Sequence, residues 1–277
     1  MGAGGVDGVR VLRLGCIAAG GGSWRTGSAG ITRGSLGLMT RLSAGVVTIT
    51  SGRETLERCV ESVRGQTYPC RQYIFADGVI DLNAFLQLEW KYASEETYVS
   101  WWSARAGGKD LEGRRLLAAA GMMVKDEVLF VLNDDDWYEP DHVESLMEII
   151  NGGCDWAYSF RKIFDEKGKF LFDDECESLG EEHPCWNIPD ENFAETCSIA
   201  MRTEKFRNLA VLYTVPGYGP DRVFYQHAKS LYPRFRGSRK HTMCFRLGGN
   251  EGSVQREYFE HGHRWMKEKY PAGMPWK

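Results

Sequence analysis

The feature that most constrains the fold is an alternation of short apolar runs with amphipathic segments between residues 46 and 150. The apolar runs have the length and bounding residues of buried strands, and the amphipathic segments have helical spacing. Strands are expected over 46–50, 73–76, 98–102 and 128–132, and helices over 56–63, 82–92, 111–124 and 141–150. Four strand–helix pairs in about 105 residues indicate parallel strands joined by right-handed crossovers, that is, a doubly wound α/β half.

A run of carboxylates directly follows the last of these strands. Asn133, Asp134, Asp135 and Asp136 come after the apolar stretch 128–132. Adjacent carboxylates repel one another and lose solvation when buried, so a cation is needed to offset them. A divalent metal with oxygen ligands supplies that charge, and a solvated acidic turn before the next helix is the simpler alternative.

Three of the expected strands end in polar residues. Thr50 and Ser51 follow the first strand, Asp77 and Gly78 the second, and residues 134–136 the last. The carboxyl ends of parallel strands meet at one edge of a sheet, and ligands bind there in open α/β sheets. The position of the carboxylates therefore favours metal and nucleotide binding over a simple acidic turn. The segment Ser51–Glu54 also matches a capping box for the first helix.

Composition narrows the class of protein. A net charge of −4 argues against a general nucleic-acid binder. No apolar run approaches the length of a membrane span, and peripheral association with a membrane stays open. The eight cysteines form no C-x-x-C pair and there is no secretory signal, which predicts reduced thiols and a cytoplasmic protein. Residues 1–45 contain thirteen glycines and one acidic residue, and we expect a disordered extension there.

The remainder, 151–277, is less regular and is expected to pack with 46–150 as one domain. The pattern predicts a strand over 155–160, a hairpin over 164–172 turning at Lys167–Gly168, an acidic loop over 173–192, a strand over 198–201, and helices near 203–210, 220–230 and 254–268. The basic run 234–240 has two interpretations, a surface that attracts an anionic diphosphate or acceptor and a solvated face.

Several segments together resemble family 2 glycosyltransferases of the GT-A fold. The strand and helix over 46–68 resemble the opening of that family, and 130–142 resembles its acidic motif with the following aromatic-x-Pro. Gly107–Gly108 and 113–115 stand where the family has a Gly-rich, Arg-containing loop, and 219–221 and 245–253 are further matches. Two positions depart from the pattern, because Ala76 and Asn133 replace acids.

The resemblance implies a nucleotide-sugar donor, expected to be a UDP-sugar, at the strand edge. Thr50 and Asp77 would meet the base and ribose, and Asp134 would lie near the ribose. Asp135, with Asp136, would hold Mn²⁺ or Mg²⁺ on the diphosphate. The implied activity is inverting transfer of a hexose-type sugar to a hydroxyl of a saccharide or other acceptor, in cell-surface polysaccharide or glycoconjugate synthesis.

Cations and a base complete the expected chemistry. Arg114 and Arg115, with Lys109, are candidates to stabilise the leaving diphosphate, or else the two arginines lie on an exposed helix face. The resemblance places the general base at Asp221, which could instead be an acid that stabilises a helix N-terminus. Reserve candidates are Glu191 and Glu195 for the base and His241 for the metal or diphosphate.

Two other functions remain open at this stage. A catalytically inactive nucleotide-sugar-binding module is consistent with Ala76 and Asn133. A nucleotidyltransferase would use the same metal, but it needs a Gly- and Lys-rich loop after the first strand, where this chain has only Ser51-Gly52-Arg53. A dehydrogenase or a P-loop kinase is excluded, since neither glycine-rich fingerprint follows a strand.

Overall fold

The computed structural model describes residues 41–78, 82–102, 105–106, 113–215, 219–248 and 254–277. They belong to one compact unit, Thr40–Lys277. Of the expected extension over 1–45, residues 1–40 lie outside the described residues. Gly107, Gly108 and Lys109 of the expected Gly-rich loop lie outside them as well. The first strand begins at Ala44, two residues before the predicted start.

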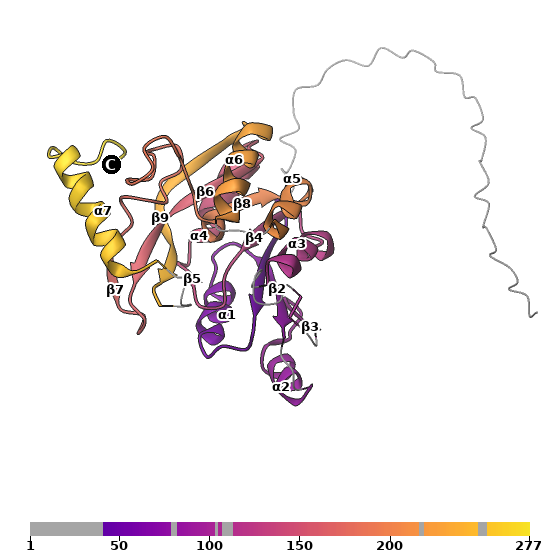
Figure 1. Ribbon diagram of the computed structural model, residues 1–277. Helices are drawn as coiled ribbons and strands as arrows, with labels where there is room; N and C mark the ends of the chain where they lie inside the picture. Colours follow the sequence, from indigo (N-terminus) through magenta and orange to yellow (C-terminus); the bar gives the residue numbers. More distant parts are fainter. Residues whose placement is uncertain (1–40, 79–81, 103–104, 107–112, 216–218, 249–253) are drawn as a thin grey trace, which may run out of the picture. The chain divides into compact units, whose positions relative to one another are not determined.

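The alternating pattern of the first half gives the expected strands and helices, together with a short strand over 137–138 that was not predicted (Figure 1). In chain order they are β1 (Ala44–Thr50), α1 (Leu56–Arg64), β2 (Cys70–Asp77), α2 (Leu82–Tyr92), β3 (Thr97–Trp102), α3 (Arg114–Met123), β4 (Val128–Val131), β5 (Trp137–Tyr138) and α4 (His142–Asn151). Strands β3, β2, β1 and β4 are neighbours in that order, and each pairs in parallel with the next. The parallel half-sheet was therefore predicted correctly.

The second half extends the same sheet with mixed directions. Its elements are β6 (Trp156–Phe164), β7 (Phe170–Asp173), η1 (Thr196–Ser198), β8 (Ile199–Arg202), α5 (Thr203–Leu209), η2 (Ala210–Thr214), α6 (Pro220–Leu231), β9 (Phe235–Arg246) and α7 (Arg256–Lys269). Strand β8 pairs antiparallel with both β4 and β6, while β9 runs parallel to β6. The result is a nine-stranded, mostly parallel sheet flanked by helices, which is the α/β class that was expected.

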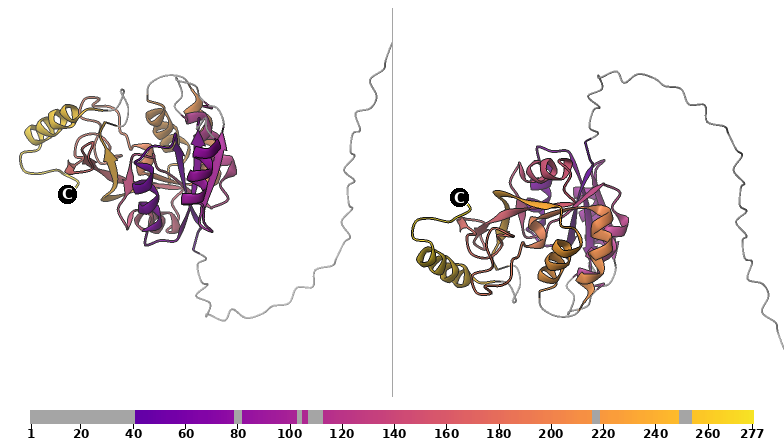
Figure 2. Two further views of the ribbon diagram at one scale, coloured as in Figure 1. Left: turned by 90° about the horizontal axis from the view of Figure 1, so that it is seen from below. Right: turned by 90° about the horizontal axis from the view of Figure 1, so that it is seen from above.

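Helices cover both faces of the sheet (Figure 2). Leu56 and Val60 of α1 pack against Ile74, and His142 of α4 meets the ring of Phe130, so α1 and α4 share one face. Leu129 and Val131 point to the opposite face, where they meet Phe206 of α5 and Phe224 of α6. Alternate residues of a strand face opposite sides of a sheet, so β4 ties both layers to the acidic run that follows it.

Strand β9 was missed from the sequence, where its first half was read as a basic run. The strand alternates poorly between exposed and buried residues until Thr242, and its register with β6 shifts around Ser159. Three cations of the basic run are in ion pairs: Arg234 binds Asp155 at 3.1 and 2.9 Å, and Arg239 and Lys240 bind Glu182 and Asp141. This run is therefore mostly neutralised and is not a free anion-attracting surface.

The predicted capping box at the first helix is wrong. Helix α1 begins at Leu56, its N-cap is Thr55, and the side chain of Thr55 makes no capping hydrogen bond. The hairpin turning at Lys167–Gly168 is confirmed by the antiparallel pairing of β6 with β7. The seven cysteines within the described ranges are all free thiols. Among the described helices, none has the length and apolar character needed to cross a membrane.

Candidate functional site

Two predicted donor-binding residues meet at the carboxyl edge of the sheet. Thr50, the last residue of β1, donates its hydroxyl to Asp134 Oδ2 at 2.7 Å, and the Thr50 hydroxyl accepts from the Gly52 amide at 2.9 Å. Asp134 follows the end of the neighbouring parallel strand β4. Parallel alignment of β1 and β4 is what brings these side chains, 84 positions apart, into contact.

Burial changes the acidity of Asp134. The side chain is almost fully buried, and this burial raises the pKa of Asp134 above its ordinary value. The Thr50 hydroxyl and the positive charge of Arg53 act in the opposite direction, while the neighbouring Asp135 adds to the rise. A carboxylate in this setting is stabilised as an anion by any additional cation.

Arg53 contacts the acidic run, which sequence reasoning missed. Its Nη1 donates to Asp135 Oδ2 at 2.7 Å and lies 3.7 Å from Asp134 Oδ1. From the sequence, Arg53 was read as part of the supposed capping box and of the 46–68 segment, with no contact to the acidic run expected. The failure of that box was not visible in the local pattern, because it depends on where the loop after β1 directs its side chains.

Asp136 is buried and held by two donors. Its Oδ1 accepts from the backbone amide of Arg246 at 2.9 Å and its Oδ2 from the side-chain amide of Asn133 at 3.2 Å. Burial, followed by the charges of Asp135 and Glu195, raises the pKa of Asp136 well above its usual range. Asn133, which stands where the resembling family has an acid, thus supports a neighbouring carboxylate.

Asp77 is the last residue of β2, and its side chain lies close to the turn that begins α3. Its Oδ1 accepts from the Ala106 amide at 2.7 Å, and a Cβ added to Gly113 would come within 3.5 Å of its Oδ2. Gly113 has φ +81° and begins the turn into α3, whose first residues are the candidate cations Arg114 and Arg115. Arg115 is exposed and donates to the Ala106 carbonyl at 3.4 Å. This places Asp77 and the two arginines around one loop.

The candidate base Asp221 lies in the first turn of α6. Pro220 is the first residue of the helix, and Asp221 Oδ1 accepts from the Arg222 amide at 2.9 Å. The Arg222 guanidinium is held by Glu177 at 2.9 Å and by the reserve candidate Glu191 at 3.3 Å. Glu191 is therefore in an ion pair, whereas no salt bridge to the carboxylate of Asp221 is found in the described part of the chain.

Glu195 connects the acidic run with Asp221. Burial raises the pKa of Glu195 to about 7, with Arg161 opposing the rise and Asp221 adding to it. The charge of Glu195 in turn raises the pKa of Asp136. Its Oε2 accepts from the Cys197 amide at 2.8 Å, which caps η1. The structure thus brings Asp136, Glu195 and Asp221 into one electrostatic neighbourhood from three separate segments.

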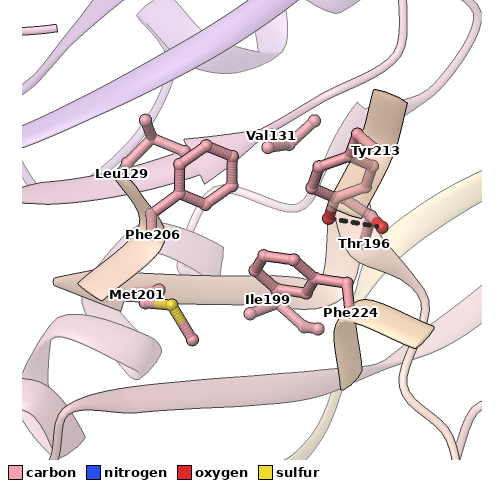
Figure 3. Close-up of a pocket in the computed structure, with 8 residues that line it drawn as sticks. All are labelled: Leu129, Val131, Thr196, Ile199, Met201, Phe206, Tyr213 and Phe224. Atoms are coloured by element: carbon pink, nitrogen blue, oxygen red, sulfur yellow. Dashed lines mark hydrogen bonds between the residues drawn. The ribbon is translucent and has the colours of Figure 1, made fainter. Parts of the chain in front are cut away.

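An apolar pocket next to this site fixes α6 against the sheet (Figure 3). It is too tight to admit a water-sized molecule, so it is a packing contact and not a ligand cavity. Phe224 of α6 points toward Ile199 of β8, and the Tyr213 hydroxyl lies 3.1 Å from Thr196 Oγ1. Since Phe224 is three residues after Asp221, this packing sets the height of Asp221 above the sheet.

His241 lies in β9, opposite Phe160 of β6, and its ring is 5.2 Å from the ring of Phe160. No contact between this histidine and the acidic run is found in the described structure. Within the described ranges, the ligand-type side chains that converge in a group of three are those of Asp174, Cys176 and His263. Asp174 already accepts from Arg161 and from three backbone amides, and His263 Nε2 accepts from the Glu175 amide at 3.2 Å. These atoms are occupied, so the cluster is structural.

The fold has counterparts among solved structures. Residues 1–349 of S. aureus TarS superpose with a TM-score of 0.55 at 13% identity, covering 82% of this chain and 65% of that one. The same TarS fragment in complex with UDP-GlcNAc gives a TM-score of 0.57 at 16% identity, covering 82% of this chain and 66% of that one. The chain spans just under two thirds of that fragment.

Sequence comparison alone finds no relative, since neither a family model nor a curated protein matches. The structural likeness shows that the chain has the GT-A-like α/β fold of TarS. It extends to TarS in complex with UDP, with a TM-score of 0.55 at 14% identity over 82% of this chain and 65% of that one. Identity this low establishes the fold, and the site must be argued from its own residues.

Proposed function

We propose that this chain is a metal-dependent, inverting glycosyltransferase of the family 2 type, which moves a hexose-type sugar from a UDP-sugar to an acceptor hydroxyl. The observation that carries the proposal is the convergence of Thr50, Asp134 and Asp135 at the carboxyl edge of a parallel sheet, in a fold shared with a protein that was captured with UDP-GlcNAc. Nucleotides bind at this edge in open α/β sheets.

The acidic run offers carboxylate oxygens to a divalent metal. Asp134 and Asp135 both approach the guanidinium of Arg53, so their oxygens lie beside a position that a cation occupies. Asp135 is the most accessible of the three aspartates, so it is the primary ligand we assign, with Asp136 behind it. A bound Mn²⁺ or Mg²⁺ would stabilise the charge that develops on the leaving diphosphate.

The remaining residues bind the donor and move a proton. Thr50 holds Asp134 in place for the ribose, and Asp77 with the start of α3 offers a second polar contact for the nucleoside. Arg114 and Arg115 begin α3, whose N-terminus favours anions. Asp221 takes the proton of the acceptor hydroxyl. The acceptor oxygen forms a bond to the anomeric carbon of the sugar, and the bond from that carbon to the diphosphate breaks.

The test is donor binding and turnover with and without metal. A thermal-shift screen of UDP-sugars with Mn²⁺, Mg²⁺ or chelator should give a metal-dependent rise in melting temperature for one donor. Release of UDP from that donor should then fall about 10²- to 10³-fold in Asp135→Asn. The matched control Asp190→Asn changes an exposed aspartate in a loop and should leave the rate unaltered.

Two results would count against the proposal. Binding of a UDP-sugar without turnover for any acceptor would favour the inactive module suggested by Ala76 and Asn133. Full activity of Asp135→Asn in the presence of chelator would remove the metal from the mechanism.

A further inference from the structure

We propose that the chain has a second small-molecule site, at the amino ends of β2 and β3, which takes a small organic cation with an ammonium group. The site is a cavity of about 200 Å³. Gln72 of β2, Thr97 of β3 and Val63 of α1 are among the residues that line it. None of the described residues assigned to the sugar donor lines this cavity, so the inference does not depend on the proposed function.

The cavity lies at the end of the sheet opposite the candidate donor site. Gln72 is the third residue of β2, whereas Asp77 is its last residue. Five residues of an extended strand span about 16 Å. Strands β1, β2 and β3 run parallel, so their amino ends lie together at this end of the sheet. A molecule bound here would therefore not compete with a nucleotide at the carboxyl edge.

Gln72 brings a hydrogen-bond acceptor without a partner to this cavity. The residue is only 1% exposed. Its Nε2 donates to Thr48 Oγ1 at 3.1 Å and to Cys59 Sγ at 3.8 Å, which fixes the orientation of the amide. Its Oε1 has no hydrogen-bond partner among the described residues. A buried acceptor without a partner is costly, so a ligand that donates a hydrogen bond to Oε1 gains affinity.

The charges around the cavity favour a cation. Glu96 also lines it, and within the described ranges no salt bridge to the carboxylate of this exposed residue is found. Arg64 lines the cavity too, but its guanidinium donates to Glu61 Oε1 at 3.0 Å and to the Tyr92 carbonyl at 3.0 Å. Helix α1 ends at Arg64, and the carboxyl end of a helix attracts positive charge.

Cys70 adds no charge to the wall of the cavity. Burial, followed by the charges of Asp126 and Glu96, raises the pKa of the Cys70 thiol to about 12. The neutral thiol donates to the Val63 carbonyl at 3.7 Å. Together with Val63 and Pro69, which also line the cavity, Cys70 offers contact to a short alkyl chain.

The volume sets the size of the ligand. An apolar cavity of about 150 Å³ holds a benzene molecule, so a cavity of about 200 Å³ has room for an alkylammonium of about five or six non-hydrogen atoms. Butylammonium has this size and, like a lysine side chain, is cationic at pH 7. Its N–H groups would donate to Gln72 Oε1 while its charge is attracted by Glu96.

Three compounds of similar size test the chemistry of the site. Titration calorimetry at constant ionic strength should show one butylammonium bound per chain. 1-Butanol keeps a donor but has no charge, so it should bind about tenfold more weakly. Butyrate has only acceptors and should not bind. Nuclear magnetic resonance of the glutamine side-chain amides should show that butylammonium shifts a signal that is missing in Gln72→Met.

Variants test the two recognising residues. Gln72→Met removes the acceptor and should weaken butylammonium binding about tenfold. Glu96→Gln removes the charge and should weaken it about threefold, since an exposed charge is screened. Glu95→Gln is the matched control, because Glu95 is an exposed neighbour that does not line the cavity, and the affinity should equal that of the parent. Circular dichroism checks folding, and Glu96→Gln with the three compounds decides if Gln72→Met does not fold.

The outcomes are distinct. Saturable binding of butylammonium that is weakened by Gln72→Met and by Glu96→Gln, but not by Glu95→Gln, supports the site. Equal affinity of all four proteins overturns it, because binding would then lie elsewhere on the surface. Preference for butyrate overturns the assignment to a cation and transfers recognition to Arg64. Absence of binding by all three compounds overturns the site as well, and leaves the cavity to water.

Discussion

The two halves of the sheet use charge in opposite ways. At the edge formed by β1 and β4, two of three consecutive aspartates, Asp134 and Asp135, are in contact with the guanidinium of the partly exposed Arg53. Behind α6, the buried Arg161 is enclosed by Asp174 and Glu177, and Glu177 is held in addition by Arg222 and the Tyr258 hydroxyl. Excess negative charge at an accessible edge is available to a ligand, whereas charge matched in the interior serves to hold segments together.

Substitution of the proposed base, Asp221, should give the largest effect on the rate of sugar transfer. Asp221→Asn keeps the size of the side chain but cannot accept the acceptor's proton, so UDP release should fall about 10³- to 10⁴-fold. Because Asp221 is assigned no contact with the donor, the affinity for UDP measured by calorimetry should stay within about twofold. A rate close to that of the parent would transfer the role to another carboxylate, with Glu195 as the next candidate.

The matched charges of the second half should matter for stability. Arg161→Met leaves Asp174 buried without a cation and Glu177 with Arg222 alone, so the free energy of unfolding in urea should drop by about 3–5 kcal/mol. Arg239→Met is the control: Arg239 is exposed and pairs with Glu182, so its loss should leave the urea midpoint nearly unchanged. An equal drop in both variants would mean that burial does not distinguish the two networks.

Titration of Glu195 should give the smallest effect, a change of the free energy of unfolding with pH. Burial raises its pKa from 4.5 to about 7 in the folded protein, so the folded state binds more protons than the unfolded state between these values. The stability contributed by the protonated carboxyl is complete below about pH 4.5 and is lost as the pH rises through about 7. This loss is on the order of 2 kcal/mol between pH 5 and pH 8.

Glu195→Gln imitates the protonated carboxyl and should flatten this dependence. Unfolding in urea at pH 5 and pH 8 measures the difference for the parent and the variant. The exposed Glu95→Gln is the control and should retain the slope of the parent. If Glu195→Gln and the parent respond equally to pH, the carboxyl is already ionised at pH 5 and does not link the two halves electrostatically.

Local pattern was sufficient for most of the first half. Short apolar runs and amphipathic segments predicted β1, α2, β3 and β4 closely, and the parallel connection placed Thr50 and Asp134 at one edge, where they are hydrogen-bonded. Asp221 also stands at the start of α6, as its Gly-Pro-Asp context suggested. These features depend on residues near one another in the chain or on a topology with few alternatives.

The sequence by itself determined the α/β alternation, the edge at which the carboxylates gather and the position of Asp221 on its helix, because helix and strand periods are written in local residue order. Tertiary structure decided the rest. It made β9 a strand through its pairing with β6 and β5, turned Arg53 toward Asp135, and brought Glu195 close enough to Asp136 and Asp221 for their charges to interact. Charge pairing of this kind joins segments far apart in the chain, and only the folded sheet brings them within reach of one another.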